Sequence, residues 1–400
     1  MEERYRKPNL IAYRTAQLVA YVFSSVVFKK KMLRNEIKDL DGPFVVIANH
    51  QAAYDFANLI GATRRRLSFV ISNSFYNSLP ITKLLKMLGV IPKQQFQTSI
   101  GDMRRIKEVI ENGGGLVIYP AGLMCEDGLS TPIPQATYKF LKWLGTDVYA
   151  ARTSGTYFAQ PKWTTGFRPG RTYLDVYKLF SAEELSEISI DEVKKRTDEA
   201  LLFDAYREQE KLMVRFSGSD NVEGLENVLY MCPNCGNEFT MRVKNKHTLH
   251  CTHCGYEEKS DEFNFLKNHK GIGEELRYVS DWSRRIFEKV KDDIRKDRDF
   301  LLSARTTIHM LDYKKHRFAR VGQGTVRLTK NGFDLRGFIG GERLELHIPT
   351  LKIPTLPFKP GKFIELQHGS DIYRCVLEDG RLAMKFINML KAMHELSFSL

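Results

Sequence analysis

Four short apolar runs between residues 43 and 153 constrain the fold most, because helix-like stretches separate them. Each run has the length of a buried strand. The runs cover residues 43–49, 67–72, 115–120 and 147–153. Residues 79–89 and 100–114 have helical apolar spacing. The second stretch ends in Asn-Gly-Gly, and a third glycine follows at 115, which is a helix stop signal. Strands that alternate with helices predict an α/β domain, with a mixed sheet flanked by helices.

The net positive charge favours an acidic binding partner. The 400 residues include 61 Lys and Arg against 48 Asp and Glu, which gives a formal net charge of +13 and a pI of about 9.3. The hydrophobic fraction of 42% is ordinary for a globular protein. Such a basic protein suits nucleic acid, an anionic membrane or phosphorylated substrates, and charge alone does not choose among them.

The first 35 residues combine an apolar segment with basic flanks. Eight Lys and Arg and two Glu give this stretch a charge of 8 − 2 = +6. Arg14 interrupts the apolar segment and leaves 14 uncharged residues, Thr15 to Phe28, fewer than the ~20 that a spanning helix needs. We predict a basic amphipathic helix over residues 1–35 that binds an anionic membrane surface. The alternative is a helix packed on the protein's own core.

A polar patch follows the first apolar run and holds one His and one Asp. His50 and Asp55 lie in the stretch Asn-His-Gln-Ala-Ala-Tyr-Asp, residues 49–55. If a strand ends before His50 and a helix starts around Asp55, the carboxylate can hold one ring nitrogen. The other nitrogen is then available as a base, which contributes roughly 10²–10⁴-fold to a rate. The alternative interpretation is a loop His beside a helix-capping Asp.

Four sequence blocks, in order, resemble the glycerolipid acyltransferase superfamily, whose best-known members make phosphatidic acid from lysophosphatidic acid. Residues 49–55 resemble its N-H-x4-D block, and residues 117–128 resemble its F-P-E-G-T-R-S-x-D-G block. Residues 89–96 and 147–163 resemble its second and fourth blocks. The resemblance extends over roughly residues 30–215.

The resemblance implies an O-acyltransferase of phospholipid biosynthesis. In such an enzyme His50 would deprotonate the hydroxyl of a lysophospholipid, lysophosphatidic acid or a related lipid. Asp55 would orient and support the imidazolium, and the alkoxide would attack the thioester of acyl-CoA or an acyl carrier protein. The protein would then act on the cytoplasmic side of the cell membrane, as a peripheral or monotopic protein.

The third block departs from the family pattern at three positions. Ala121 stands where the family has Glu, Leu123 where it has Thr, and Met124 where it has Arg. The resemblance implies that this Arg holds the acceptor's phosphate, which a Met side chain cannot do. Either the acceptor differs from lysophosphatidic acid, or another cation replaces the Arg. The predicted substrate-binding residues are Lys93, Tyr119, Pro120, Ala121, Gly122 and Arg152.

Four of the six cysteines form the pattern C-x2-C-x15-C-x2-C: Cys232, Cys235, Cys251 and Cys254. This spacing predicts a zinc ribbon whose four thiolates hold a structural Zn²⁺. A redox-active pair of dithiols is the alternative. Cys125 and Cys375 stand alone, so the cysteines do not form a disulfide scaffold, and they indicate a reducing, intracellular compartment.

Residues 301–400 contain strand-like runs, Gly turns and a closing amphipathic helix. This order is similar to PH-like or GRAM-like domains, which implies a lipid-surface or protein-docking module. A β-sandwich without a ligand is the alternative. The predicted organisation is an interface helix, an acyltransferase domain, a zinc ribbon, connecting helices and a PH/GRAM-like domain, over residues 1–35, 36–220, 228–260, 261–300 and 301–400.

Two other classes of function stay open. Ala121 and Met124 allow a catalytically inactive acyltransferase fold that binds lipid or serves as a scaffold, whereas His50 and Asp55 argue against it. A zinc ribbon in a basic protein allows nucleic-acid binding, but residues 241–250 lack the interleaved aromatic residues of stacking platforms. The sequence therefore favours a membrane-associated acyltransferase and disfavours nucleic acid as a partner.

Overall fold

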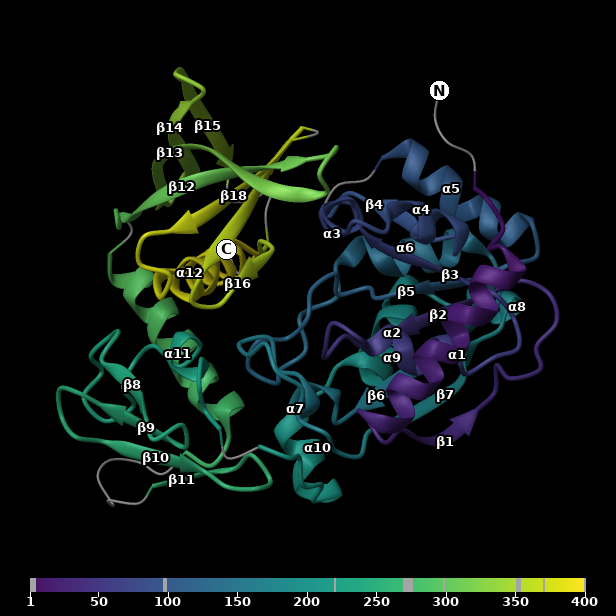
Figure 1. The fold of residues 1–400 in the computed structure, drawn as a ribbon, viewed down its shortest axis with the longest axis horizontal. Coiled ribbons are helices and arrows are strands. Elements are labelled where there is room, and N and C mark those ends of the chain that lie inside the picture. The colour runs from purple at the N-terminus through teal and green to yellow at the C-terminus, as the bar shows by residue number, and fades with distance from the viewer. Residues whose placement is uncertain are drawn as a thin grey trace. The chain divides into compact units, whose positions relative to one another are not determined.

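The computed structural model describes residues 5–95, 99–218, 221–268, 276–297, 299–349, 354–369 and 371–398 (Figure 1). The chain divides into two compact units, Met1–Ser217 and Gly218–Leu400, and each has its own sheet structure. Arg4, one of the basic residues of the predicted interface helix, and Phe96, the last residue of the predicted second block, lie outside the described residues.

A seven-stranded sheet forms the centre of the first unit. Its strands are β1 (Lys31–Asn35), β2 (Phe44–Ala48), β3 (Leu67–Ser72), β4 (Ile91–Lys93), β5 (Gly115–Ile118), β6 (Val148–Ser154) and β7 (Tyr173–Phe180). They are ordered β1-β7-β6-β2-β5-β3-β4. The five strands from β6 to β4 are parallel, whereas β7 is antiparallel to β6 and pairs in parallel with β1. The sheet is therefore mixed.

Helices cover both faces of this sheet. They are α1 (Leu10–Val26), α2 (Asp55–Ile60), α3 (Asn73–Ser78), α4 (Thr82–Met87), α5 (Ile100–Glu111), α6 (Gln135–Leu144), α7 (Thr156–Ala159), α8 (Ala182–Glu187), α9 (Ile190–Leu201) and α10 (Ala205–Leu212). Successive side chains of a strand point to opposite faces. In β2, Val45 and Ile47 pack with α5, α6 and α9, whereas Val46 packs with α1 and α2. The predicted α/β architecture is confirmed.

The central position of β2 fixes the place of the polar patch. All five residues of β2 are buried, and the strand lies between β5 and β6. Because β2, β5 and β6 are parallel, the loops that follow them leave the same edge of the sheet. Residues 49–55, 119–122 and 155–163, which belong to three of the predicted blocks, are thereby collected at one edge.

The N-terminal helix is shorter than predicted. α1 ends at Val26, and Lys29 adopts a left-handed φ of 42° before the chain turns back. Residues 31–35, predicted as part of the interface helix, form β1, and the Lys31 amide donates to the Thr172 carbonyl at 2.8 Å. The predicted boundary at residue 35 is wrong, because pairing with β7 places this segment in the sheet of the first unit.

The second unit contains two antiparallel sheets. The smaller has the order β11-β10-β9-β8, and the larger has the order β15-β14-β13-β12-β18-β17-β16. The smaller sheet comprises β8 (Met241–Lys244), β9 (Thr248–Cys251), β10 (Glu257–Ser260) and β11 (Leu266–Asn268). The larger comprises β12 (Leu302–Asp312), β13 (Arg317–Thr329), β14 (Gly332–Ile339), β15 (Glu342–Pro349), β16 (Phe358–Lys359), β17 (Phe363–His368) and β18 (Asp371–Leu377).

Helices accompany both sheets of this unit: η1 (Leu225–Asn227), α11 (Val279–Lys296) and α12 (Leu382–Phe398). Phe386 of α12 packs on Phe333 of β14, with ring centroids 5.7 Å apart. The predicted β-rich C-terminal region is confirmed at this level. Residues 261–300, predicted as connecting helices, hold α11 as their one helix among the described residues. Leu266–Asn268 form a strand instead, because they pair with β10.

Candidate active site

The side-chain amide of Asn49 anchors the start of the loop between β2 and α2. The Asn49 side chain donates from Nδ2 to the Thr153 carbonyl and accepts from the Thr153 amide at Oδ1, both at 2.8 Å. These two bonds join the end of β2 to β6 and thereby fix the backbone that leads into His50. Asn49 is buried, and its side chain serves the fold of this loop.

His50 and Asp55 meet at the end of this loop. His50 Nδ1 lies 3.0 Å from Asp55 Oδ2, which also accepts from the amides of Gln51 at 2.7 Å and Ala52 at 2.9 Å. Asp55 opens α2 and is fully buried, while the His50 side chain is 21% exposed. With its proton on Nδ1, the imidazole keeps the Nε2 lone pair for a substrate. The arrangement suits a general base.

Tyr119 packs against the imidazole. The rings of His50 and Tyr119 have centroids 4.5 Å apart and an interplanar angle of 34°. The Tyr119 hydroxyl is buried and has no hydrogen-bond partner in the part of the chain that the structure describes. Burial, with the nearby charge of Asp55, raises the pKa of Tyr119 well above its usual value. Tyr119 therefore stays protonated and limits the orientations that the imidazole can take.

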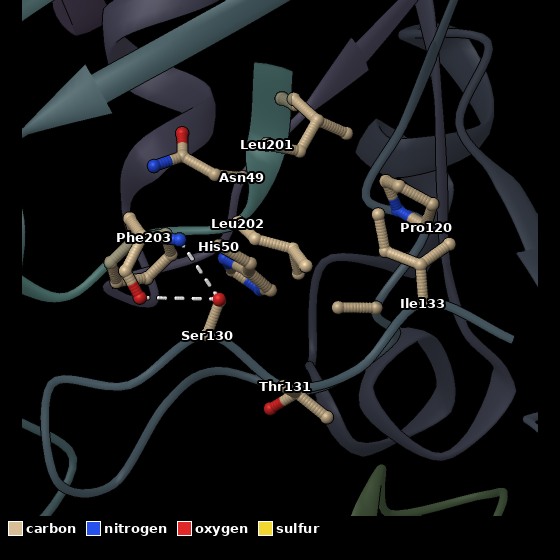
Figure 2. A pocket seen from close by; sticks show the side chains of 11 residues that line it. Asn49, His50, Pro120, Ser130, Thr131, Ile133, Leu201, Leu202 and Phe203 are labelled. Atoms are coloured by element: carbon tan, nitrogen blue, oxygen red, sulfur yellow. Dashed lines mark hydrogen bonds between the residues drawn. The ribbon is translucent and has the colours of Figure 1, made fainter. Parts of the chain in front are cut away.

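A small, open pocket lies beside His50 (Figure 2). Its polar lining residues are Asn49, His50, Ser130 and Thr131. Its apolar lining residues are Ala48, Pro120, Ala121, Ile133, Leu201, Leu202 and Phe203. The wall formed by Leu201–Phe203 is tied to the opposite loop, because the Ser130 hydroxyl accepts from the Phe203 amide at 2.9 Å. The pocket therefore suits an uncharged part of a small molecule or lipid that combines hydroxyl groups with apolar surface.

The predicted substrate-binding residues divide into two groups. Pro120 and Ala121 line the pocket, and Tyr119 and Gly122 flank them. Gly122 has φ of 71°, a left-handed conformation that favours glycine at this turn. Its carbonyl accepts from the Gln95 side chain at 2.7 Å. The structure therefore places the predicted second and third blocks side by side.

The two predicted cations, Lys93 and Arg152, do not line the pocket. Arg152 pairs with Glu208 on α10, with Nε 3.1 Å from Oε1. The Lys93 ammonium donates to the Gln94 carbonyl at 3.0 Å, and burial lowers its pKa. The structure therefore does not bring either cation to the pocket beside His50.

A buried ion pair anchors the third block and was not predicted from the sequence. Lys162 Nζ lies 3.6 Å from Glu126 Oε2, and both side chains are about 5% exposed. Lys162 also donates to the Met124 carbonyl at 3.3 Å. The signal available in the sequence was the single Lys inside the fourth block, but its partner lies 36 positions away, 162 − 126 = 36.

Cys125 is unsuited to nucleophilic chemistry. It is buried, and its amide donates to the His50 carbonyl at 3.4 Å. Burial, with the nearby charge of Asp127, raises the pKa of the Cys125 thiol well above its usual value. Because the thiolate is the reactive form, Cys125 supports the backbone of the site.

Four cysteines of the second unit form a candidate metal centre. The sulfurs of Cys232, Cys235, Cys251 and Cys254 all lie within 4.8 Å of one another. Cys232 and Cys254 are 3.7 Å apart at Sγ, and Cys235 and Cys251 are 3.8 Å apart. Zn–S bonds of ~2.3 Å in a tetrahedron place sulfurs about 3.8 Å apart. The four cysteines could therefore hold one tetrahedral metal ion.

Residues 26–155 match the family model described as Acyltransferase. This segment holds β1 to β6 and carries His50, Asp55 and Tyr119 of the candidate active site. The predicted resemblance is confirmed at that level. No curated protein matches the chain.

Among solved structures, the chain is similar to PlsC from Thermotoga maritima, a 1-acyl-sn-glycerophosphate (LPA) acyltransferase. The identity is 20%, the TM-score is 0.43, and the match covers 50% of this chain and 79% of that one.

Proposed function

We propose that the protein transfers a fatty acyl group from acyl-CoA or an acyl carrier protein to the hydroxyl of a lysophospholipid, lysophosphatidic acid or a related lipid. One observation carries this proposal. In an acyltransferase domain, His50 Nδ1 is held 3.0 Å from a buried Asp55 beside a largely apolar pocket. A base next to an apolar pocket is what acylation of a lipid alcohol requires.

In the proposed reaction, His50 carries one proton from the acceptor hydroxyl to the leaving thiolate. His50 Nε2 takes the proton of the acceptor hydroxyl as its oxygen attacks the thioester carbonyl. Asp55 stabilises the imidazolium that forms, and the two amide bonds to Asp55 keep its carboxylate in place. The tetrahedral intermediate collapses, the C–S bond breaks, and the imidazolium returns its proton to the leaving thiolate.

A panel assay tests the proposal. The full chain is incubated with acyl-CoA or acyl carrier protein donors and a series of lyso-lipid acceptors, and the products are identified by mass spectrometry. Formation of the acylated lipid with release of thiol is expected. Binding of the lipids without any turnover would instead support the catalytically inactive lipid-binding protein.

We further propose that α1 places the protein on an anionic membrane surface at the cytoplasmic side, as a peripheral or monotopic protein. α1 packs through Tyr13, Ala20 and Ser24, and its opposite side exposes apolar residues. They are Leu10, Ile11, Leu18, Val19, Tyr21, Val22 and Val26. Lys29 and Lys31 follow on the surface and can attract anionic lipids. Within the described residues, no helix is both long and apolar enough to cross a bilayer.

Charges on this face should weaken membrane binding. The double variant Leu18→Glu, Val22→Glu is expected to bind anionic vesicles at least tenfold more weakly, because each apolar side chain buried in lipid is worth about 1.5–3 kcal/mol. Vesicle co-sedimentation measures the effect. Ile190→Glu, at an exposed position that opens α9, is the matched control and should bind as wild type does. If wild type and both variants bind the vesicles equally, α1 does not contact the membrane.

We also propose that the four cysteines hold a structural Zn²⁺ as a zinc ribbon. Each Cys pair is followed by a glycine with positive φ, Gly236 at 73° and Gly255 at 77°. The Gly236 and Gly255 amides donate to the carbonyls of Cys232 and Cys251, both at 3.0 Å, so the two turns repeat the same conformation. Four thiolates fill a tetrahedral shell, which suits a structural ion.

Metal analysis tests the zinc proposal. Purified protein is expected to contain about one zinc per chain, and Cys254→Ser should lose most of it, because structural zinc contributes roughly 10–16 kcal/mol to folding of such modules. Cys375→Ala, at a cysteine in β18 outside the cluster, should retain the metal. A metal-free wild type that unfolds at the same temperature with and without chelator would contradict the proposal.

The larger sheet and α12 are proposed to form a PH/GRAM-like module that contacts a lipid surface or a protein. Support comes from the seven-stranded antiparallel order and from α12, which buries Phe386, Ile387 and Leu390 and packs on β14. A closing helix on an antiparallel sheet is the arrangement that the resemblance implies.

A further inference from the structure

We propose that the pocket beside His50 binds an uncharged polar end of the acceptor lipid, so that the preferred acceptor has no phosphate monoester next to the hydroxyl that is acylated. A monoacylglycerol has this chemistry. The inference rests on the proposed acyltransferase function and narrows it to one class of acceptor.

The first support is the charge of the pocket. Among the residues that the structure describes, none that lines the pocket is a Lys, Arg, Asp or Glu, and seven of these eleven are apolar. A phosphate monoester carries a charge of ≈ −1.5 to −2 near pH 7. An unpaired ion is far more costly to remove from water than a hydroxyl, unless cations or several donors compensate it. The lining provides no cation for that purpose.

The second support is that two cations of the fourth block, Lys162 and Arg152, are already paired with carboxylates. Lys162 is enclosed with Glu126 and with the Met124 carbonyl. Arg152 is held by Glu208, and its Nη1 also donates to the Ala200 carbonyl at 3.4 Å. Because each positive charge has a carboxylate beside it, recruiting either one to a phosphate would leave a half-buried or buried carboxylate uncompensated.

The third support is a hydroxyl that the fold leaves available. Ser130 is occupied by both the amide and the carbonyl of Phe203, and Asn49 is occupied by Thr153. Thr131 is 7% exposed, lines the pocket, and its side chain makes no hydrogen bond within the described residues. Figure 2 shows Ser130 and Thr131 along one border of the pocket, across from Leu201.

These features define a site for two neighbouring hydroxyl groups. One hydroxyl of the acceptor would donate to His50 Nε2 and become acylated. The next would exchange a hydrogen bond with the Thr131 hydroxyl, while the lipid chain contacts the apolar wall. Thr131 is thus assigned as an acceptor-binding residue.

The acceptor's charge is tested by a matched pair of lipids. Monoacylglycerol and lysophosphatidic acid with the same acyl chain are presented to the full chain in neutral phosphatidylcholine vesicles, and kcat/KM is measured for each. We expect kcat/KM at least tenfold higher for monoacylglycerol. Equal or higher kcat/KM for lysophosphatidic acid would overturn the inference.

Failure of the proposed function gives a different result. If neither lipid is turned over, binding of a 1-O-alkylglycerol is compared with binding of its 3-phosphate by fluorescence titration. Tighter binding of the neutral lipid upholds the inference about the pocket even when the enzyme is inactive. Tighter binding of the phosphate refutes it.

Thr131→Val separates the hydroxyl from the shape of the side chain. We expect KM for monoacylglycerol to rise about five- to tenfold with kcat nearly unchanged, because a hydrogen bond of about 1–1.5 kcal/mol is lost. Thr137→Val on α6, outside the pocket lining, is the matched control and should keep the wild-type KM. An unchanged KM for monoacylglycerol in Thr131→Val would show that the Thr131 hydroxyl does not bind the acceptor.

Discussion

His50→Ala is expected to lower kcat for acyl transfer by at least ~10²- to 10⁴-fold, because it removes the only base that the site offers next to the pocket among the described residues. Asp55→Asn should also lower kcat, since an amide provides weaker support for the imidazolium than the carboxylate now 3.0 Å from Nδ1. Release of free thiol from the acyl donor, followed over time, measures both effects.

Binding must be separated from catalysis in this experiment. His50 is partly exposed and packs on Tyr119 without filling the core, so His50→Ala should keep the circular dichroism and the vesicle binding of wild type. Wild-type turnover in a folded His50→Ala protein would show that the proposed mechanism is wrong.

The second large effect concerns stability. Lys162→Met is expected to lower the free energy of unfolding of the first unit by about 3–5 kcal/mol, because the buried Glu126 carboxylate would lose the ammonium that lies 3.6 Å from its Oε2. Lys162→Met combined with Glu126→Gln should recover much of this loss, since no uncompensated charge remains. Urea unfolding, followed by tryptophan fluorescence, gives the free energies of the three proteins.

A surface pair provides the comparison for this effect. Lys178 and Asp147 lie 2.7 Å apart, with side chains 44% and 32% exposed. Lys178→Met should therefore cost less than about 1 kcal/mol. If Lys162→Met costs no more than Lys178→Met, the Glu126–Lys162 pair does not hold the third block in place.

The sequence predicted those parts of the site that depend on short-range signals. Val45–Ala48 form a continuous apolar run, and a strand followed by a polar patch with His50 and Asp55 places both groups at the edge of a parallel sheet. The strands and helices around them follow from apolar spacing in the same way. The resemblance to the family blocks indicated which loops contribute residues to the site at this edge.

The remaining features depend on contacts between distant segments. Leu201–Phe203 line the pocket because the Phe203 amide donates a hydrogen bond to Ser130, 73 positions away. No local sequence pattern predicts that contact. Arg152 was a candidate for phosphate binding because its charge is visible in the sequence, whereas its partner Glu208 is not identifiable there. β1 was missed because a five-residue basic strand takes its register from β7, which lies far along the chain.

The pairing of β1 with β7 has a consequence for how this protein could leave a bilayer. The segment that carries α1, the proposed membrane helix, continues through the turn at Lys29 into an outermost strand of the central sheet. Deleting residues 5–35, which include β1, would expose the edge of β7 that β1 pairs with and favour self-association through its unpaired backbone amides. If α1 binds a membrane as proposed, the intact chain should leave it by reversible desorption, and a form that lacks β1 is expected to precipitate.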